Sequence, residues 1–300
     1  MGSVQKGVGR WWLEQVGSRL AVVSMTRYRG VWATLGLLAA VLFVIWWAWG
    51  KWGRNVVDDP AFQVKAEQIV LPPTPKWIRS DIRAEALRES SLERLSLLDP
   101  EVTLKIRRAF ELHPWIASVE YVSKRAGGRI LVEVRYRRPI IMVVTENGNG
   151  WWPVDTMGVL LPPADFSQND PLGFFQVYTP FHRPAGDVGT SFGHAGVVGA
   201  ARLATLLDDH RTQWGLVSIH ARHLNPGRES EIEYELRTRG GTRILWGAAP
   251  GNEPRGESTA EEKLARLEQF AAARGTLDLR PPVTLDIRHT LTHVETTVAR

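Results

Sequence analysis

A serine between two glycines is the first place in this sequence where chemistry would be sought. The segment GTSFG, Gly189 to Gly193, fits the G-x-S-x-G pattern of a nucleophile elbow, in which a strand enters a strained turn that exposes the serine hydroxyl. The preceding residues, RPAGDVG, are typical of a loop, and a helical pattern follows. We therefore interpret GTSFG as a loop and helix N-cap. An exported, membrane-anchored serine hydrolase that uses Ser191 stays as an alternative function.

Histidine pairs are the second candidate for chemistry. His220 and His223 lie on or beside a predicted strand, and they would bind a metal only with a third ligand from elsewhere. No matching cluster of Asp and Glu is evident, so we interpret both as solvated histidines at a strand end. The same interpretation applies to His289 and His293. The chain has no cysteine, which excludes disulfides and thiolate metal sites.

Other catalytic patterns are missing from the sequence: we find no phosphate loop, no convincing triad and no paired carboxylates. A basic run, Arg135, Arg137 and Arg138, lies on one side of a predicted strand, and we interpret it as a solvated face, with an acidic partner as the alternative. The sequence therefore predicts a protein that binds proteins. We expect no enzyme activity, no cofactor, no metal and no small-molecule substrate.

The positive charge is concentrated at one end of the chain. The net charge is +5, and residues 1–30 alone hold five Lys and Arg residues against one Glu. A nucleic-acid-binding protein would carry its basic patch on a folded domain, whereas here the excess lies next to an apolar run. We therefore expect no nucleic acid partner.

The apolar run is VWATLGLLAAVLFVIWWAWG, residues 31–50, which has no charged residue. As a helix it would span about 30 Å, the thickness of a hydrocarbon core, with tryptophans at its far end where indoles favour the interface. A buried globular helix or a cleaved signal peptide would be the alternatives. We expect a retained single-pass anchor. By the positive-inside rule, the N-terminus stays in the cytoplasm and residues 51–300 are exported.

The exported part begins with a strand and two helices. FQVKAEQIVLPP, residues 62–73, reads as a first strand, and RSDIRAEALRES as a short helix capped by Ser80 or Asp81. A second helix has Asp99 as its expected N-cap and Pro100 at its first position. Its apolar stripe is Val102, Ile106, Ala109 and Phe110. The helix must end before Pro114.

Two alternating strands follow the Pro-Trp corner. Val119 and Tyr121 alternate with polar residues in the first strand, and residues 130–136 alternate in the second. Residues 62–138 therefore read β-α-α-β-β, with two helices on one face of a three-stranded sheet. Pro114 sets the turn from helix to strand, and Trp115 is expected to fill the seam between the two layers.

This part of the chain resembles the POTRA domain of the FtsQ/DivIB family of bacterial cell division proteins. That family has a helix ending in His-Pro-Trp, a Val-x-x strand, a basic turn, a Leu-x-Val-x-Val strand and a Glu-Arg-x-Pro exit. The matching residues here are His113, Pro114, Trp115, Val119, Leu131, Val134, Arg137 and Pro139. Tyr136 stands where the family has Glu, and Pro72-Pro73 where its first strand ends with Gly.

The resemblance continues downstream. ENGNGWWPVDTMGVLL indicates a hairpin around an Asn-Gly turn, and is similar to the family's Val-Asp-x-x-Gly-x-Val passage. We expect Asp155 to bind its own backbone in an Asx turn there. VTLDIRH, residues 283–289, is similar to the terminal Asp-Leu-Arg strand, although TLDLR, residues 276–280, competes for that alignment. Periodicity predicts further strands in GLVSIHA, SEIEYELRT and GTRILWG, and helices in HAGVVGAARLATLL and residues 260–273.

The expected architecture is therefore α+β with five parts. They are a cytoplasmic basic tail (1–30), a transmembrane helix (31–50), a linker (51–61), a POTRA domain (62–139), and a mixed α/β unit with antiparallel strands, the family's β-domain (140–298).

The resemblance implies a non-enzymatic scaffold of the division machinery in the bacterial inner membrane, at the septum. Small membrane partners of the FtsB/FtsL type would add a strand to the β-domain edge. By position, the docking residues would be Leu285, Ile287, His293, Val294 and Glu295. A POTRA protein of another envelope assembly or export system is a further alternative.

Overall fold

A computed structural model describes residues 29–57, 60–92, 94–167, 169–180, 182–223, 231–289 and 293–296. The chain divides into two compact units, one comprising residues 1–63 with 94–99, the other residues 64–93 with 100–300. Most of the predicted POTRA domain and the whole β-domain therefore fall in the second unit. The predicted cytoplasmic tail, except for its last two residues, lies outside the described residues.

The first unit contains the long apolar helix α2 (Arg29–Val57). Its segment Gly30–Lys51, 22 residues, is long and apolar enough to cross a membrane, and none of it is buried within the structure. The helix continues past Gly50 into the segment expected to be a linker. Extension of an existing helix adds one hydrogen bond per residue fixed, so the chain stays helical until it approaches Pro60, where the 3₁₀ turn η1 (Pro60–Phe62) begins.

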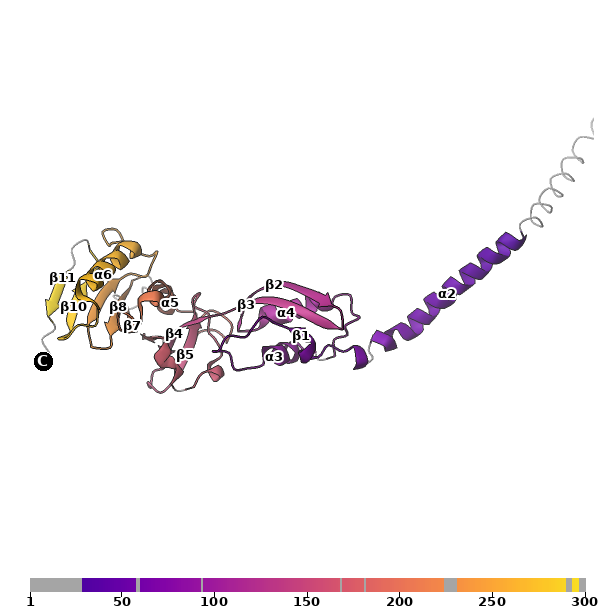
Figure 1. Cartoon of the computed structure of the whole chain (residues 1–300), viewed down its shortest axis with the longest axis horizontal. Coiled ribbons are helices and arrows are strands. Elements are labelled where there is room, and N and C mark those ends of the chain that lie inside the picture. Colours follow the sequence, from indigo (N-terminus) through magenta and orange to yellow (C-terminus); the bar gives the residue numbers. More distant parts are fainter. Residues whose placement is uncertain are drawn as a thin grey trace, which may run out of the picture. The chain divides into compact units, whose positions relative to one another are not determined.

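The second unit begins with the expected order β-α-α-β-β (Figure 1). Its three-stranded sheet has the order β1-β3-β2, with β1 parallel and β2 antiparallel to β3. The elements are β1 (Ile69–Val70), α3 (Ile82–Glu89), α4 (Val102–Leu112), β2 (Ile116–Arg125) and β3 (Arg129–Tyr136). The α+β class with mixed sheets is confirmed.

Two boundaries differ from the prediction. The first strand is only two residues long, because the 3₁₀ turns η1 and η2 (Ala66–Gln68) occupy most of the preceding alternating segment. The second helix has Glu101 as its N-cap, whereas Asp99 was expected. Asp99 donates its backbone N–H to the carbonyl of Ser96, so a turn precedes the helix and delays its start. The expected cap of α3 is confirmed, since the Asp81 carboxylate accepts from the Arg83 N–H.

The layer between helix and sheet is apolar, as predicted. Val102, Ile106, Ala109 and Phe110 are all buried, and so are the inward residues of β3. Val119 and Tyr121 both lie on β2, as expected, but Val119 is buried whereas Tyr121 is 45% exposed. The pairing of β2 with β3 shifts register between Val119 and Tyr121, and an extra residue in a strand sends the next side chain to the other face.

The rest of the second unit forms an eight-stranded mixed sheet with the order β11-β10-β9-β8-β7-β6-β4-β5. The pairs β4–β6, β6–β7 and β9–β10 are parallel, and the others are antiparallel. The strands are β4 (Pro139–Val144), β5 (Trp151–Asp155), β6 (Phe175–Tyr178), β7 (Leu216–His223), β8 (Ile232–Thr238), β9 (Arg243–Gly247), β10 (Val283–Asp286) and β11 (His293–Thr296).

Two helices, α5 (Ala195–Leu207) and α6 (Ala260–Arg274), share one apolar core with this sheet. Alternate residues of β7 to β10 face that core, among them Ile219, Leu236, Ile244 and Leu285, which are paired across these four neighbouring strands. Strand β4 differs, because all six of its residues are buried. Short 3₁₀ turns connect the elements: η3 (Pro163–Asp165), η4 (Asp170–Gly173) and η5 (Asp208–His210).

Candidate protein-docking surface

The Pro-Trp corner is a buried anchor. Trp115 is completely buried, as predicted, and its indole N–H donates to the Asp165 carboxylate at 2.6 Å. Asp165 also accepts from the Ser80 hydroxyl and the Arg79 backbone N–H. The corner therefore ties the β-α-α-β-β part to the connection between β5 and β6. Nothing in the sequence pattern pointed to Asp165.

His113 and Pro114 complete the corner. The His113 ring is buried, its Nδ1 accepts from the Trp115 N–H, and its Nε2 lies 3.3 Å from a Glu85 oxygen. Burial lowers the pKa of His113 even though the Glu85 carboxylate opposes the shift, which favours the neutral ring that this pair of contacts requires. Pro114 packs on Gly189: a side chain at Gly189 would begin 3.3 Å from the Pro114 Cα, and its φ of +89° also favours glycine.

Arg137 corrects the prediction of a solvated basic face. Its guanidinium Nη1 lies 2.8 Å from the Asp155 Oδ2, and the two side chains are only 19% and 3% exposed. The other oxygen of Asp155 accepts from the backbone N–H groups of Met157 and Val159, as the Asx-turn expectation required. β3 ends at Tyr136, so Arg137 and Arg138 lie in the connection to β4 and do not share a strand face with Arg135.

The neighbours of Arg137 have other roles. Arg135 is 72% exposed beside Glu120, whereas Arg138 pairs with Asp208. Pro139 is buried at the start of β4. The basic run is therefore divided among a surface pair, an internal ion pair and a contact to η5.

Ser191 lies in a loop that closes around the Asp155 turn. Leu160 and the GTSFG loop exchange backbone hydrogen bonds: Leu160 donates to Thr190 and accepts from Gly189. The Ser191 hydroxyl accepts from the Gly193 N–H at 3.3 Å. Strand β6 ends at Tyr178, and the described residues between it and Ser191 contain no strand. The strand that a nucleophile elbow needs is thus missing from the described part of this segment.

The histidines of β7 do not converge on a metal. His220 stacks on Tyr178 with ring centroids 4.7 Å apart, and its Nε2 lies 3.1 Å from the Ser218 hydroxyl. Within the described ranges, no group of three His, Asp or Glu side chains is placed to hold a metal ion. His289 is exposed, with Nδ1 near the Gly256 carbonyl. The side chain of His293 lies outside the description.

His220 predicts a pH effect on stability. Burial lowers the pKa of His220 from its ordinary 6.5 to about 4, with Arg237 contributing. Between these values the unfolded chain takes up a proton that the folded chain does not, so stability falls as pH drops from 6.5 toward 4. For this partly exposed ring we expect a loss of roughly 2 kcal/mol. Urea unfolding of the full chain in detergent at pH 7 and 4.5 measures it.

The matched comparison for that effect uses two substitutions. His220→Gln should reduce the loss of stability between the two pH values, whereas His289→Gln, at an exposed site, should leave it unchanged. An identical pH dependence in His220→Gln and the unaltered chain would show that His220 is not the group responsible.

The eight-stranded sheet has two terminal strands, β5 and β11, and β11 is the one that carries predicted docking residues. It pairs antiparallel with β10 on one side, and no described strand pairs with its other side. His293, Val294 and Glu295, three of the predicted docking residues, lie on it. The other two do not: Leu285 and Ile287 are buried in the core, at 0% and 1% exposure. Both belong to the apolar core that the sheet shares with α5 and α6.

Backbone geometry shows which residues of β11 face outward. Ile287 donates its N–H to the Leu245 carbonyl of β9. Consecutive residues of a strand direct their backbone N–H and C=O groups to opposite sides. Asp286 therefore directs its N–H and C=O toward β11, where it pairs in register with His293. Val294, next in β11, therefore directs its backbone N–H and C=O away from β10. An unpaired edge of this kind is a template for another strand.

The polar face of the sheet behind this edge carries an ion network. The Glu235 side chain is 4% exposed and lies within 3.4 Å of the guanidinium groups of Arg222, Arg237 and Arg243. Burial disfavours its charge, but hydrogen bonds from Arg243 and Arg237 outweigh burial and lower the pKa of Glu235 to about 2. The Glu235 carboxylate therefore stays ionised at neutral pH, held among three guanidinium groups.

No protein-family model matches this chain, and no curated protein matches its sequence. The functional inference therefore depends on the residues and the geometry described above.

Proposed function

We propose that this chain is a membrane-anchored, non-enzymatic scaffold of the bacterial division machinery, of the FtsQ/DivIB type. In this proposal, residues 62–139 are a POTRA domain and residues 140–298 a β-domain. The observation that carries it is the free edge strand β11, at the end of a sheet that follows a β-α-α-β-β unit with a buried His-Pro-Trp corner. The division role in this proposal comes from the resemblance of the sequence to the FtsQ/DivIB family.

The docking mode is strand addition to β11. A partner segment in extended conformation would pair with the outward N–H and C=O groups of Val294 and the residues in phase with it, so main-chain hydrogen bonds supply affinity. The four residues of β11 offer a short edge, which suits a segment of similar length next to a coiled coil. Partners of the FtsB/FtsL type, small membrane proteins, are those that the resemblance implies.

The anchor and the topology belong to the same proposal. Helix α2 would cross the inner membrane once, with the basic N-terminal residues in the cytoplasm and both folded domains outside it. The protein would then act at the septum, and the β11 edge would meet the exported parts of its partners.

A proline at Val294 tests the docking edge. Val294→Pro removes one outward N–H donor, and proline is tolerated on an edge strand where the N–H faces away from the sheet. We expect the fold to survive and capture of an FtsB/FtsL-type coiled coil by the full chain to be lost. Pull-down from detergent-solubilised membranes measures capture, and circular dichroism checks the fold.

Val294→Ala is the matched control, because it shortens the same side chain and keeps the N–H. It should capture the partner at close to the unaltered level. If Val294→Pro captures the partner as well as Val294→Ala does, the docking edge is not β11 and the proposal for this site is wrong.

A further inference from the structure

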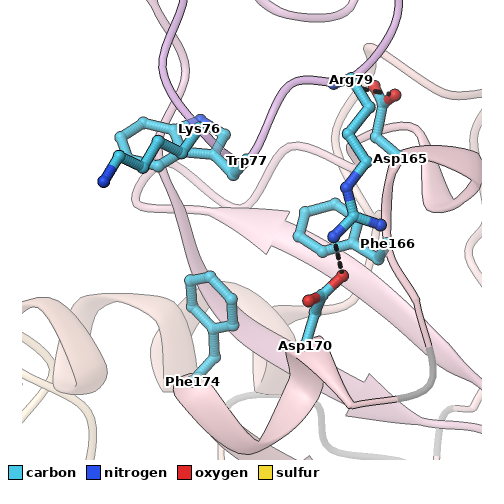
Figure 2. Close-up of a pocket in the computed structure, with 7 residues that line it drawn as sticks. All are labelled: Lys76, Trp77, Arg79, Asp165, Phe166, Asp170 and Phe174. Carbon is cyan, nitrogen blue, oxygen red and sulfur yellow. Dashed lines mark hydrogen bonds and ion pairs between the residues drawn. The ribbon is translucent and has the colours of Figure 1, made fainter.

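A pocket of about 230 Å³ lies between the segment that joins β1 to α3 and the connection from β5 to β6 (Figure 2). Lys76, Trp77 and Arg79 come from the first segment. The second contributes Asp165, Phe166, Asp170 and Phe174. The volume is below the range of about 300–1,000 Å³ that small-molecule sites occupy, so it accommodates a single large side chain rather than a cofactor.

The aromatic walls of this pocket are held in place from behind. The Trp77 indole N–H donates to the Arg137 carbonyl at 3.2 Å, which fixes the ring. Phe166 packs 6.1 Å from the buried Trp115 and 6.2 Å from Phe174, with Phe166 and Phe174 edge to face at 79°. The three pocket rings are only partly buried, so a preformed apolar corner is left open to an incoming group.

The charged groups around that corner differ in how many hydrogen-bond and ion-pair partners they have. Both oxygens of Asp165 already accept hydrogen bonds, and one Asp170 oxygen accepts from the Ser167 N–H and from Arg79. Lys76, in contrast, is exposed and has no ion pair among the residues that the structure describes. Three of the four carboxylate oxygens of the pocket thus accept hydrogen bonds, and Lys76 is its cation without an ion pair among the described residues.

This combination discriminates between classes of ligand. A cationic ligand would meet Lys76 and Arg79 as like charges, while the Asp170 charge is already compensated by Arg79. A neutral sugar prefers one flat aromatic platform, and here the rings form a corner in which three of the four carboxylate oxygens already accept hydrogen bonds. An apolar side chain with a carboxylate beside it would pack on the rings and pair with Lys76. Aromatic residues and cations make contacts of this kind at interface hot spots.

We propose that this pocket binds an acidic peptide segment of a partner protein through one aromatic or leucine side chain. The apolar side chain lies against Trp77, Phe166 and Phe174, and a flanking carboxylate pairs with Lys76. This docking site does not use β11 and is independent of the function proposed above.

Fluorescence anisotropy of a labelled hexapeptide, EDFLED, tests the proposal with the full chain in detergent micelles. The neutral counterpart QNFLQN should bind about tenfold more weakly. Lys76→Glu and Phe174→Ala should each weaken EDFLED binding by about tenfold. Arg125→Glu is the matched control: it makes the same charge change at an exposed cation outside the pocket, and should alter binding by less than about twofold.

Several results would overturn the inference. They are no binding of EDFLED by the unaltered chain, equal binding by Lys76→Glu, equal binding of QNFLQN, or displacement of EDFLED by an N-acetylglucosamine oligomer, which would indicate a saccharide site. Circular dichroism verifies the fold of Phe174→Ala. If that variant is unfolded, Lys76→Glu, which changes an exposed side chain, decides the question alone.

Discussion

Replacement of Trp115 by alanine will lower the free energy of unfolding by about 3–5 kcal/mol. The side chain is completely buried, so its removal leaves a large cavity between helix and sheet. It also removes the indole donor to Asp165, a buried carboxylate whose remaining donors are a hydroxyl and one backbone N–H. Urea unfolding of the full chain in detergent, followed by near-ultraviolet circular dichroism, measures the change.

Two further variants separate the causes of that loss. Trp115→Phe keeps most of the ring volume but removes the N–H, and should cost about 1–3 kcal/mol, the effect of an unsatisfied buried acceptor. Leu112→Ala, three residues earlier and 80% exposed, should change stability by less than about 0.5 kcal/mol. A Trp115→Ala protein as stable as Leu112→Ala would show that the indole does not pack as described.

Replacement of Asp155 by alanine is the second large effect, and we expect it to cost about 3–5 kcal/mol. It leaves the guanidinium of Arg137 largely buried without its partner. It also deprives the Met157 and Val159 N–H groups of their acceptor, which opens the turn after β5. Thermal and urea unfolding in detergent both report the loss.

A double-mutant cycle isolates the ion pair from the turn. Arg137→Met removes the charge, and the combined Asp155→Ala and Arg137→Met variant should be more stable than the sum of the single effects predicts. The exposed pair Arg135 and Glu120 is the control, since Arg135→Ala should cost under about 1 kcal/mol. Strict additivity in the cycle would mean that the two buried side chains do not interact.

The sequence predicted a helix cap, an apolar stripe and a helix boundary that depend on residues only a few positions apart. Asp81 caps α3 because its carboxylate reaches an N–H two residues away, and the apolar stripe of α4 follows from helical spacing. The break at Pro114 follows from proline geometry, so the end of α4 was predictable too. Of the two segments that competed for the last alignment, the later one forms a strand, since β10 begins at Val283 and residues 276–280 contain none.

The remaining features depend on contacts distant in sequence. Trp115 and Asp165 are fifty residues apart, so the indole's partner could not be identified from periodicity. The bulge that exposes Tyr121 has no composition signal, and Leu285 is buried because it packs in the core that the sheet shares with α5 and α6. Of the five predicted docking residues, three lie on the terminal strand β11 and two, Leu285 and Ile287, are core residues.

The strand order has a consequence for the timing of assembly. From β7 to β11, each strand lies beside the strand that precedes it in the chain, so this part of the sheet grows in one direction as synthesis proceeds. Every newly made strand covers the edge that its predecessor had exposed. The edge that carries Val294 therefore comes into existence last, after residue 296 has been made. A partner that recognises this edge recognises a finished sheet and ignores every shorter intermediate.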